Sequence, residues 1–299
     1  MKKMLFVMNP NAGTRKAAKV LPDIISVFNQ AGYQVSVHMT AGQSDASRIV
    51  EQLAGEMDLV VCCGGDGTFN ETVTGLLDAG ADVPVGYIPA GSTNDFATSL
   101  NLSPNPVQAA RDILEGRELR YDVGLFGDRY FTYVASFGAF TRASYATPQN
   151  VKNTLGHTAY VLEGITELTQ IKKIHVHMEL DDGVVEDDFL FGAISNSTSV
   201  GGILSLDPTL VDLSDGLFEV LLVRAPRNVG ELMECIQALR TRNYDKCAMI
   251  TFRSTSRVKV TTGADLVWTL DGERADTDGP IDVRNLNRAI RLITKVRMP

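Results

Sequence analysis

The sequence of 299 residues has no long apolar run, no paired cysteine motif and no excess of basic side chains. No stretch approaches the roughly 18 apolar residues that a membrane-spanning helix needs, so we expect no membrane span. The first apolar piece, residues 4–8, is too short for the core of a signal peptide, and no small-residue cleavage site follows it. The sequence therefore predicts a globular protein that stays in the cytoplasm.

The cysteines and the charge balance exclude further classes of protein. No two cysteines form a Cys-x-x-Cys pair, which argues against a zinc site or a redox dithiol, and we expect buried, reduced thiols at Cys62, Cys63, Cys235 and Cys247. The 28 basic and 36 acidic side chains give a formal net charge of −8. A nucleic-acid partner is therefore not expected, because such a partner usually needs a basic face.

Residues 1–121 alternate between short apolar runs and segments with helical spacing. Continuous apolar runs are typical of strands buried on both faces, and apolar residues at a period of 3.6 are typical of helices. Ser44 is expected to cap the second helix. This order predicts a doubly wound parallel sheet, which binds ligands at the carboxyl ends of its strands. Strands are expected over 4–8, 33–39, 59–63 and 85–88, and helices over 17–28, 46–54 and 73–77.

After residue 121, apolar and polar residues alternate in short runs, as is typical of antiparallel strands. The basic segment 284–297 is predicted to be a strand, either a solvated edge or a strand that returns to the first domain. We therefore predict a second, mainly antiparallel β domain. Strands are expected over 174–180, 189–194, 218–223, 257–261 and 266–270, and helices over 158–170 and 229–239.

The strongest motif directly follows the third predicted strand. Three glycines within four positions let the backbone approach a ligand, and the following helix N-terminus can hold an anion. A carboxylate beside phosphates indicates a bridging divalent cation, and Asp66 occupies that place. A plain turn would need fewer glycines. The motif consists of Gly64, Gly65, Asp66, Gly67, Thr68, Phe69, Asn70 and Glu71.

Two further polar turns follow strands of the same predicted sheet. In residues 89–95, Gly91 gives backbone freedom, Ser92 offers a hydroxyl and Asp95 offers a second carboxylate. A helix N-cap is the alternative interpretation of that turn. All three turns are expected at one edge of the sheet. The remaining turn follows the first strand and contains Asn9, Pro10, Asn11, Ala12 and Gly13.

Together the three motifs resemble the catalytic domain of soluble bacterial diacylglycerol kinases, a lipid kinase family that is related to sphingosine and ceramide kinases. The Gly-Gly-Asp-Gly-Thr piece alone is less specific, because NAD kinases and phosphofructokinases use similar turns. The resemblance implies an α/β ATP-binding domain over 1–121 and a mainly antiparallel β-sandwich lipid-substrate domain over 122–299. It extends over most of the chain through residues 122–124, 144–148, 215–218 and 271–273.

The resemblance also implies roles for individual residues. Asp66 and Asp95 would hold the catalytic Mg²⁺, directly or through water. Either Asp271 or Glu273 would act as general base toward the lipid hydroxyl. A structural Mg²⁺ would bind the Asp215 carboxylate and the backbone carbonyls of Asp212 and Leu217, with a simple hairpin turn as the alternative. The implied ATP-binding set is Asn9 to Gly13, Thr40, Gly64, Gly65, Asp66, Gly67, Thr68, Phe69, Asn70, Glu71 and Ser92.

The implied reaction transfers the γ-phosphoryl group of ATP to diacylglycerol, giving phosphatidic acid in phospholipid metabolism. Since that substrate lies in a membrane, the enzyme is expected to work as a peripheral protein at the inner membrane surface. Residues 137–155 are a candidate apolar rim for membrane contact, with ordinary packing as the alternative. The oligomeric state stays open, with a homodimer as one option. Competing readings are a kinase of another lipid alcohol, an NAD kinase-like enzyme and a non-catalytic nucleotide-binding protein.

A separate candidate site lies on one predicted strand. His175, His177 and Glu179 alternate along residues 174–180, so their side chains lie on one face of that strand. Imidazole and carboxylate groups are zinc ligands, so the three side chains could bind zinc. An exposed polar strand face explains them as well, and we favour that interpretation.

Overall fold

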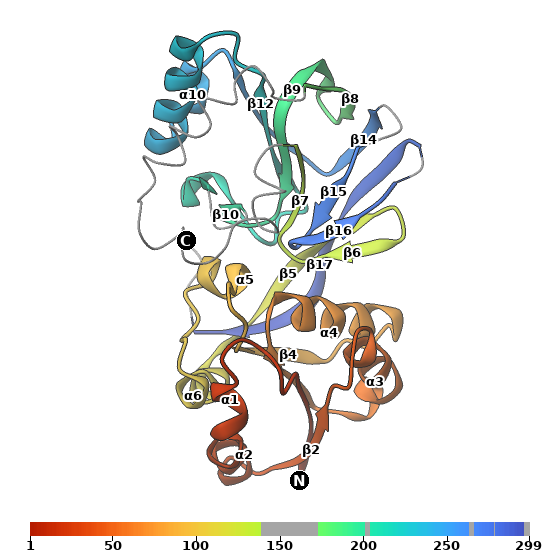
Figure 1. Ribbon diagram of the computed structural model, residues 1–299. Coiled ribbons are helices and arrows are strands. Elements are labelled where there is room, and N and C mark those ends of the chain that lie inside the picture. Colours follow the sequence, from red (N-terminus) through yellow and green to blue (C-terminus); the bar gives the residue numbers. More distant parts are fainter. Residues whose placement is uncertain (139–172, 201–203, 263–265, 278, 296–299) are drawn as a thin grey trace.

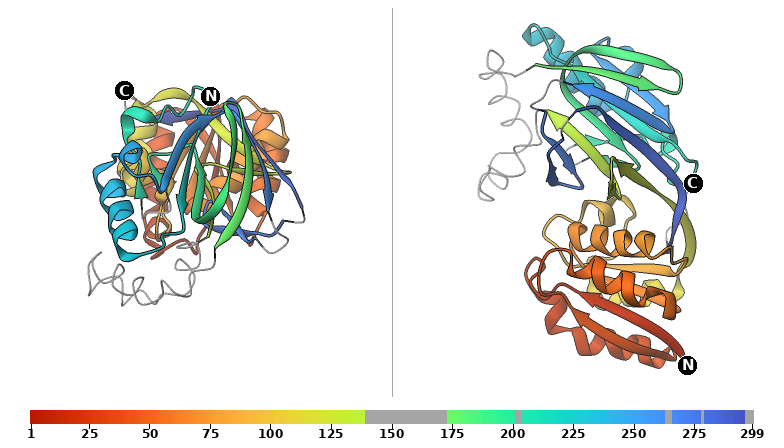
Figure 2. Two further views of the ribbon diagram at one scale, coloured as in Figure 1. Left: turned by 90° about the horizontal axis from the view of Figure 1, so that it is seen from above. Right: turned by 90° about the vertical axis from the view of Figure 1, so that its right-hand side faces the viewer.

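A computed structural model of the chain describes residues 1–138, 173–200, 204–262, 266–277 and 279–295. The chain forms two stacked halves, an α/β half at the bottom of Figure 1 and a β-rich half above it. Figure 2 shows long strands that pass from one half to the other. The helix expected over 158–170 and most of the rim expected over 137–155 lie outside the described residues.

Four parallel strands in the order β4-β3-β1-β2 form the centre of the α/β half. Successive side chains point to opposite faces, so Phe6 and Cys63 pack toward α2 and α6, whereas Val7 and Cys62 pack toward α3 and α4. Helices cover both faces, which confirms the predicted doubly wound sheet. The elements are β1 (Lys2–Met8), α1 (Lys16–Lys19), α2 (Leu21–Gln30), β2 (Tyr33–Met39), α3 (Asp45–Leu53), η1 (Ala54–Glu56), β3 (Leu59–Gly64), α4 (Asp66–Asp78), β4 (Pro84–Pro89), α5 (Asp95–Ser99) and α6 (Pro106–Glu115).

The helices differ from the expectation in several places. The segment over 17–28 is divided into α1 and α2, with a proline in the first turn of α2, where it is well tolerated. Ser44 lies at the N-cap of α3, but its side chain makes no capping hydrogen bond, so that prediction is wrong. Helix α6 was not expected; the Asn105 side chain caps it by accepting from the backbone N–H groups of Val107 and Gln108.

The β-rich half surrounds an aromatic core. Trp268 packs against Phe137 and Phe126, with ring centroids 4.8 and 5.0 Å away. Phe137, a member of the expected rim, is therefore fully buried and offers nothing to a membrane. Further elements are β6 (Arg129–Phe131), β7 (Val134–Gly138), β8 (Ile174–Leu180), β9 (Gly183–Ser195), β10 (Ser199–Val200), β11 (Leu204–Ser205), η2 (Pro208–Leu210), β12 (Phe218–Arg224), α10 (Val229–Thr241), η3 (Tyr244–Lys246), β13 (Ile250–Thr255), β14 (Arg257–Thr262), β15 (Trp268–Leu270) and β16 (Glu273–Ala275).

Two long strands, β5 (Arg117–Phe126) and β17 (Ile281–Thr294), join the halves (Figure 1). β17 pairs with β14 in the β-rich half and then runs parallel to β4 in the α/β half. β5 pairs with β17 in the antiparallel direction. Of the two alternatives for this segment, the solvated edge strand is therefore wrong, and β17 instead returns to the α/β half. Its basic side chains looked solvated because their acidic partners are distant in sequence: Arg291 pairs with Glu118 at 2.7 Å.

The four cysteines are buried and free, as predicted, although the fold brings the sulfur atoms of Cys235 and Cys247 within 3.7 Å. Cys62 and Cys63 lie on opposite faces of β3, in separate clusters of the core. None of the helices in the described part of the chain has both the length and the apolar character that crossing a membrane requires.

Candidate active site

Three loops meet at the carboxyl edge of the parallel sheet: the first after β1, the second between β3 and α4, and the third between β4 and α5. A Cβ on Gly13 of the first loop would come within 2.4 Å of the carbonyl oxygen of Ala90 in the third. A Cβ on Gly91 would come within 2.6 Å of the Cα of Gly65 in the second. Only glycine fits at these two positions, because the loops lie in contact there. The contact brings the three sequence motifs together at one site, as the sequence predicted.

Asp66 lies at the first position of α4, and its carboxylate holds the start of α5. It accepts hydrogen bonds from the backbone N–H groups of Asp95 (3.1 Å) and Phe96 (3.3 Å). Burial, assisted by the negative charges of Asp95 and Asp271, raises the pKa of Asp66 to about 6 despite these bonds. A carboxyl group with that pKa is ionised at neutral pH and lies beside backbone N–H groups that can hold phosphate.

Asp271 lies in the turn between β15 and β16 and is buried. Its residue adopts the left-handed conformation, with φ 49°, which aims the carboxylate into the protein. Burial raises the pKa of Asp271, while hydrogen bonds from the backbone oppose that shift. Five donors within 2.6–3.1 Å fill the accepting positions of the carboxylate: the backbone N–H groups of Thr132, Tyr133 and Val134, the Thr132 hydroxyl and the Asn70 amide.

Glu273 comes two residues later and is exposed. Its Oε1 lies 2.9 Å from the point where a Cβ on Gly67 would be, so a larger residue at 67 would displace this carboxylate. The carboxylate of Glu273 therefore reaches from the β-rich half to the N-terminal turn of α4. Of the two acids that the sequence singled out as bases, Asp271 has its oxygens occupied, and Glu273 faces the glycine-rich motif.

Asn70 connects the two halves of the site. Its amide donates to the Asp271 carboxylate at 2.8 Å and to the backbone carbonyl of Tyr130 at 3.0 Å. The sequence placed Asn70 only in the ATP-binding set, because its partner in the β15–β16 turn lies 201 residues away. These hydrogen bonds therefore fix the position of helix α4 relative to the turn that carries Glu273.

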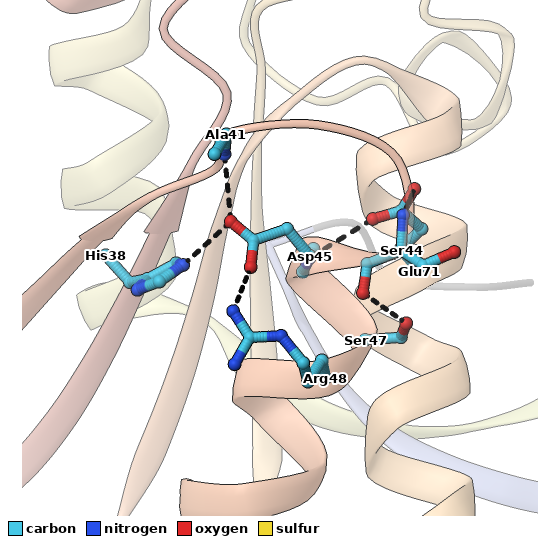
Figure 3. A network of polar contacts seen from close by, with 8 residues as sticks. His38, Ala41, Ser44, Asp45, Ser47, Arg48 and Glu71 are labelled. Carbon is cyan, nitrogen blue, oxygen red and sulfur yellow. Dashed lines mark hydrogen bonds and ion pairs between the residues drawn. The ribbon is translucent and has the colours of Figure 1, made fainter.

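Glu71 contacts a backbone loop. Its carboxylate accepts from the N–H groups of Ser44 (2.8 Å) and Ala46 (3.2 Å), and so caps α3 from the neighbouring helix (Figure 3). The loop that it holds carries Thr40, whose own N–H donates to the Met8 carbonyl at 2.8 Å. Glu71 therefore positions the loop that follows β2.

Asp45 fastens the same loop from the other side, as Figure 3 shows. It accepts from the Ala41 N–H at 2.8 Å and lies 3.1 Å from Nε2 of His38. The hydrogen bond from Ala41, followed by those from His38 and Arg48, lowers the pKa of Asp45 to about 2. Two carboxylates that come from different elements thus define the conformation of this loop.

Asn94 is a site residue that the sequence analysis did not single out. Its side-chain oxygen accepts from the Gly91 N–H at 2.8 Å, and its amide donates to the Gly91 carbonyl at 2.9 Å. Asn94 has φ 53°, and asparagine tolerates this left-handed conformation better than most residues. The Asn94 side chain therefore closes the third loop. The Gly-Ser-Thr-Asn sequence of that loop contains the signal for such a turn.

Comparison with known proteins identifies the family. Residues 3–126 match the family model of the diacylglycerol kinase catalytic domain, and residues 134–294 match that of the YegS C-terminal NAD kinase beta sandwich-like domain. Diacylglycerol kinase of Staphylococcus epidermidis is 30% identical over 295 residues, covering 98% of this chain and 92% of the relative. The chain belongs to the diacylglycerol kinase family. It is accordingly an enzyme, a lipid kinase.

Further comparisons agree with this family. Diacylglycerol kinase of Bacillus subtilis is 31% identical over 275 residues, which cover 91% of the lipid kinase described here and 90% of the relative. A crystal structure of a diacylglycerol kinase from Bacillus anthracis str. Sterne is 22% identical and superposes with a TM-score of 0.77, covering 100% and 98% of the two chains. That structure shares the fold, including the β-sandwich predicted for the second half.

The turn expected to hold a structural Mg²⁺ in this lipid kinase is already ordered by hydrogen bonds. The Asp212 and Asp215 carboxylates accept from the backbone N–H groups of Ser214 and Leu217, at 2.9 Å each. The Leu217 carbonyl accepts from the Asn285 amide at 3.0 Å. This geometry alone is that of a stable turn, so a further observation must decide whether the residues suit a cation.

Two buried acceptors beside this turn lack a hydrogen-bond partner among the described residues, Oε2 of Glu219 and Oδ1 of Asn285. Burial, together with the negative charge of Asp215, raises the pKa of Glu219 to about 8. A cation would compensate both effects, since carboxylate and amide oxygens are the ligands of Mg²⁺. No group of three acidic side chains in the described part of the chain is already arranged around a metal ion. The chemistry of these residues nevertheless suits a divalent cation, which the Asp215 carboxylate and the Asp212 and Leu217 carbonyls would hold, with Glu219 nearby.

We expect Glu219→Gln to stabilise the Mg²⁺-free protein at pH 8. The pKa of Glu219 is higher in the folded chain than its ordinary value of 4.5, so the folded state binds more protons between these values and loses stability as the pH rises through that window. Removing the charge should raise the free energy of unfolding at pH 8 by on the order of 2 kcal/mol. Denaturant titrations at pH 5 and 8, with and without Mg²⁺, check this.

The wild-type protein should regain that stability on addition of Mg²⁺, and Glu219→Gln should gain less. Glu179→Gln, which changes an exposed carboxylate of the same half, serves as control and should leave the pH dependence unchanged. Equal pH slopes in the wild type and in Glu219→Gln would contradict both the raised pKa and the fit to a cation.

Proposed function

We propose that this lipid kinase transfers the γ-phosphoryl group of ATP to the hydroxyl group of diacylglycerol, giving ADP and phosphatidic acid. The observation that carries the proposal is the place of Glu273, whose carboxylate reaches over Gly67 at the start of α4. Transfer to an alcohol needs a base that faces bound phosphate, and this arrangement meets that need. The names of the relatives support diacylglycerol as the acceptor.

The three loops would bind ATP. Backbone N–H groups at the start of α4 and in the first loop would hold the phosphates, because few side chains intervene between the glycines and a ligand. The hydroxyl of Ser92 and the loop that carries Thr40 would contact the remainder of the nucleotide. Glu71 would act at a distance from ATP, through the loop that it holds.

Asp66 and Asp95 would hold the catalytic Mg²⁺. Bound there, the ion would offset the charge that develops on the phosphoryl oxygens. Asp66 is the first residue of α4 and Asp95 the first residue of α5, and the Asp66 carboxylate joins the two helix N-termini by accepting from the Asp95 N–H. The pKa of Asp66, about 6, leaves it ionised at neutral pH. Asp271 would keep the β15–β16 turn in place and would make no contact with the substrates.

Glu273 would accept the proton of the lipid hydroxyl. The freed oxygen would bond to the γ-phosphorus while the bond from that phosphorus to the oxygen it shares with the β-phosphate breaks, and ADP would leave with that electron pair. The hydrogen bond between Asn70 and Asp271 would hold Glu273 at the distance from the phosphates that this step requires.

A transfer assay with γ-labelled ATP tests this proposal. The acceptors are diacylglycerol, ceramide, sphingosine and phosphatidylglycerol in mixed micelles, and NAD without lipid. We expect label in phosphatidic acid, and none when Asp66→Asn is used. Label in another lipid would replace the acceptor and retain the mechanism. Label in NAD alone would refute the assignment of a lipid substrate.

We also propose that the enzyme meets its substrate as a peripheral protein at the inner membrane surface. Activity on vesicles at fixed bulk diacylglycerol should rise several-fold with the anionic lipid fraction, because each basic side chain near such a surface gains roughly 1 kcal/mol. Vesicle flotation should show binding that increases in parallel. Constant activity without vesicle binding would instead indicate an acceptor that is presented in solution.

A further inference from the structure

The loop over 40–44, here called the β2–α3 loop, lies beside the first loop of the candidate site. β2 pairs in parallel with β1, so Met39 lies opposite Met8, and the Thr40 N–H donates to the Met8 carbonyl at 2.8 Å. The next residue after Met8 is Asn9, where the first loop begins. Because the carboxyl ends of parallel strands share an edge of the sheet, the β2–α3 loop borders the place where ATP would bind.

Two carboxylates hold the two ends of the β2–α3 loop, as Figure 3 shows. Asp45, the first residue of α3, accepts from the Ala41 N–H at 2.8 Å, and Glu71 of α4 accepts from the Ser44 N–H at 2.8 Å. Hydrogen bonds to an ionised acceptor are roughly twice as strong as those between neutral groups. The backbone at both ends of the loop is therefore fixed before any ligand binds.

The Asp45 carboxylate is in turn held by two side chains. Its Oδ2 lies 3.1 Å from Nε2 of His38, and its Oδ1 pairs with Arg48. Asp45 is ionised at neutral pH, because its hydrogen bonds, that from Ala41 above all, lower its pKa to about 2. An ionised carboxylate can only accept, so Nε2 of His38 is the donor. With 12% of its side chain exposed and three donors around it, Asp45 has one well-defined position.

Helices α3 and α4 form one rigid support for this loop. A Cβ on Gly75 of α4 would come within 2.4 Å of the Ser47 carbonyl oxygen of α3, so the two helices lie in close contact. Helix α4 begins at Asp66, which would hold the catalytic Mg²⁺, and also carries Glu71. The β2–α3 loop is therefore fixed to the same support as the phosphate end of the site.

The tip of the β2–α3 loop stays open. Gly42 and Gln43 are exposed, and their backbone N–H groups have no hydrogen-bond partner among the residues that the structure describes. A Cβ on Gly42 would meet nothing within 4 Å. The phosphates would lie at the start of α4, so these N–H groups and the Thr40 hydroxyl are left for the uncharged polar groups of a nucleoside.

We propose that Asp45 is a positioning residue for ATP, which sets the affinity for the nucleoside part of the nucleotide by holding the β2–α3 loop. The inference rests on the proposed function, since it assigns a role within the same ATP site. A loop that is already fixed loses less conformational entropy when a ligand binds, so the ligand binds more tightly. Removal of the Asp45 carboxylate frees the Ala41 end of the loop and leaves the glycine-rich turns unchanged.

Titration calorimetry with MgADP, together with initial rates, tests this role. Asp45→Ala should weaken MgADP binding about 10-fold, the effect of losing a hydrogen bond to a charged group. Asp45→Asn, which keeps one acceptor, should weaken it less. The KM for ATP should rise by the same factors with kcat near that of the wild type, because the loop contributes to binding alone. Glu51→Gln, an exposed carboxylate of the same helix, is the matched control and should bind MgADP as the wild type does.

Tripolyphosphate, which lacks a nucleoside, separates the two ends of the nucleotide site. As a competitor of ATP it should inhibit the wild type and both Asp45 variants with the same inhibition constant. Hydrogen exchange of the wild-type protein keeps the test independent of folding of the variants. MgADP should slow exchange in a peptide that covers residues 40–44, and tripolyphosphate should leave exchange there unchanged.

Three results would each overturn the role of Asp45. They are an unchanged MgADP affinity in both variants, an equal loss of affinity for tripolyphosphate, and a decrease in kcat without a rise in the KM for ATP. Failure of the wild-type protein to bind MgADP would be a different result. It would refute the proposed function itself, and with it the role of Asp45.

Discussion

Asp66→Asn is expected to lower kcat by at least about 100-fold, the effect of removing one preorganised charge from a reaction centre. Asparagine has nearly the same shape and keeps one oxygen to accept from the start of α5, so the fold should persist. The pKa of Asp66 is raised to about 6 in the folded chain, which means that its ionised form lowers the stability at neutral pH. Asp66→Asn removes this destabilising charge but also removes the acceptor of one backbone N–H group of α5. Because the two effects oppose each other, the melting temperature should stay close to that of the wild type.

The pH dependence of the wild-type enzyme gives a second readout of Asp66. Protonated Asp66 cannot hold a cation, so kcat should fall as the pH drops through about 6 at low Mg²⁺. Raising Mg²⁺ should move this decline to lower pH, because metal and proton compete for the carboxylate. Rates measured between pH 5 and 8 at two Mg²⁺ concentrations check this expectation.

Asp78→Asn is the matched control, because Asp78 is exposed at the opposite end of the same helix. It should retain wild-type kcat and pH dependence. A kcat within a few-fold of wild type in Asp66→Asn at saturating Mg²⁺ would refute the role of Asp66 in holding the ion.

The gathering of the three loops could be predicted from the sequence alone. Each loop follows a continuous apolar run, such runs form parallel strands, and the carboxyl ends of parallel strands share an edge. The close contacts of Gly13 and Gly91 with the neighbouring loops now explain why glycine recurs there. Local patterns were sufficient because every step depended on strands that are near in sequence.

The roles of Glu71 and Asp271 could not be predicted in this way. Glu71 was placed in the ATP-binding set, yet its carboxylate holds backbone N–H groups 25 and 27 residues away. Asp271 was one of two candidate bases, yet its oxygens are filled by donors from 132–134 and from Asn70. Which polar group meets which is decided by tertiary packing, and neither periodicity nor spacing contains that information.

Two gaps in the prediction had different origins. Helix α6 was missed although its signals were present: Asn105 precedes a proline at the helix start, and Ala109 and Ile113 recur at helical spacing. The sequence could not decide whether the basic segment that begins at residue 284 is a solvated edge or a strand that returns to the first domain, because basic residues alone give no sign of their partners. Their acids lie on other elements, as with Lys295 and Asp112 of α6, 2.8 Å apart.

Glu273→Gln and Asp271→Asn should separate the chemistry of the site from its architecture. Glutamine cannot accept the hydroxyl proton, so kcat should fall by about 100- to 10,000-fold, the range for loss of a general base. The KM for ATP and the melting temperature should stay near wild type, because Glu273 is exposed. Arg274→Gln, the adjacent exposed residue, is the control and should leave kcat unchanged.

Asp271→Asn should act through structure. An amide group directs two N–H donors toward the backbone N–H groups of residues 132–134, so at least one buried donor loses its acceptor, at about 1–3 kcal/mol. We expect a melting temperature several degrees lower, and a decrease in kcat because the turn no longer holds Glu273. Thermal melts and initial rates of both variants decide the roles. Normal turnover in Glu273→Gln, together with an inactive but fully stable Asp271→Asn, would make Asp271 the base and remove that role from Glu273. The reason is that loss of a base need not lower stability, whereas loss of a carboxylate that accepts five hydrogen bonds must.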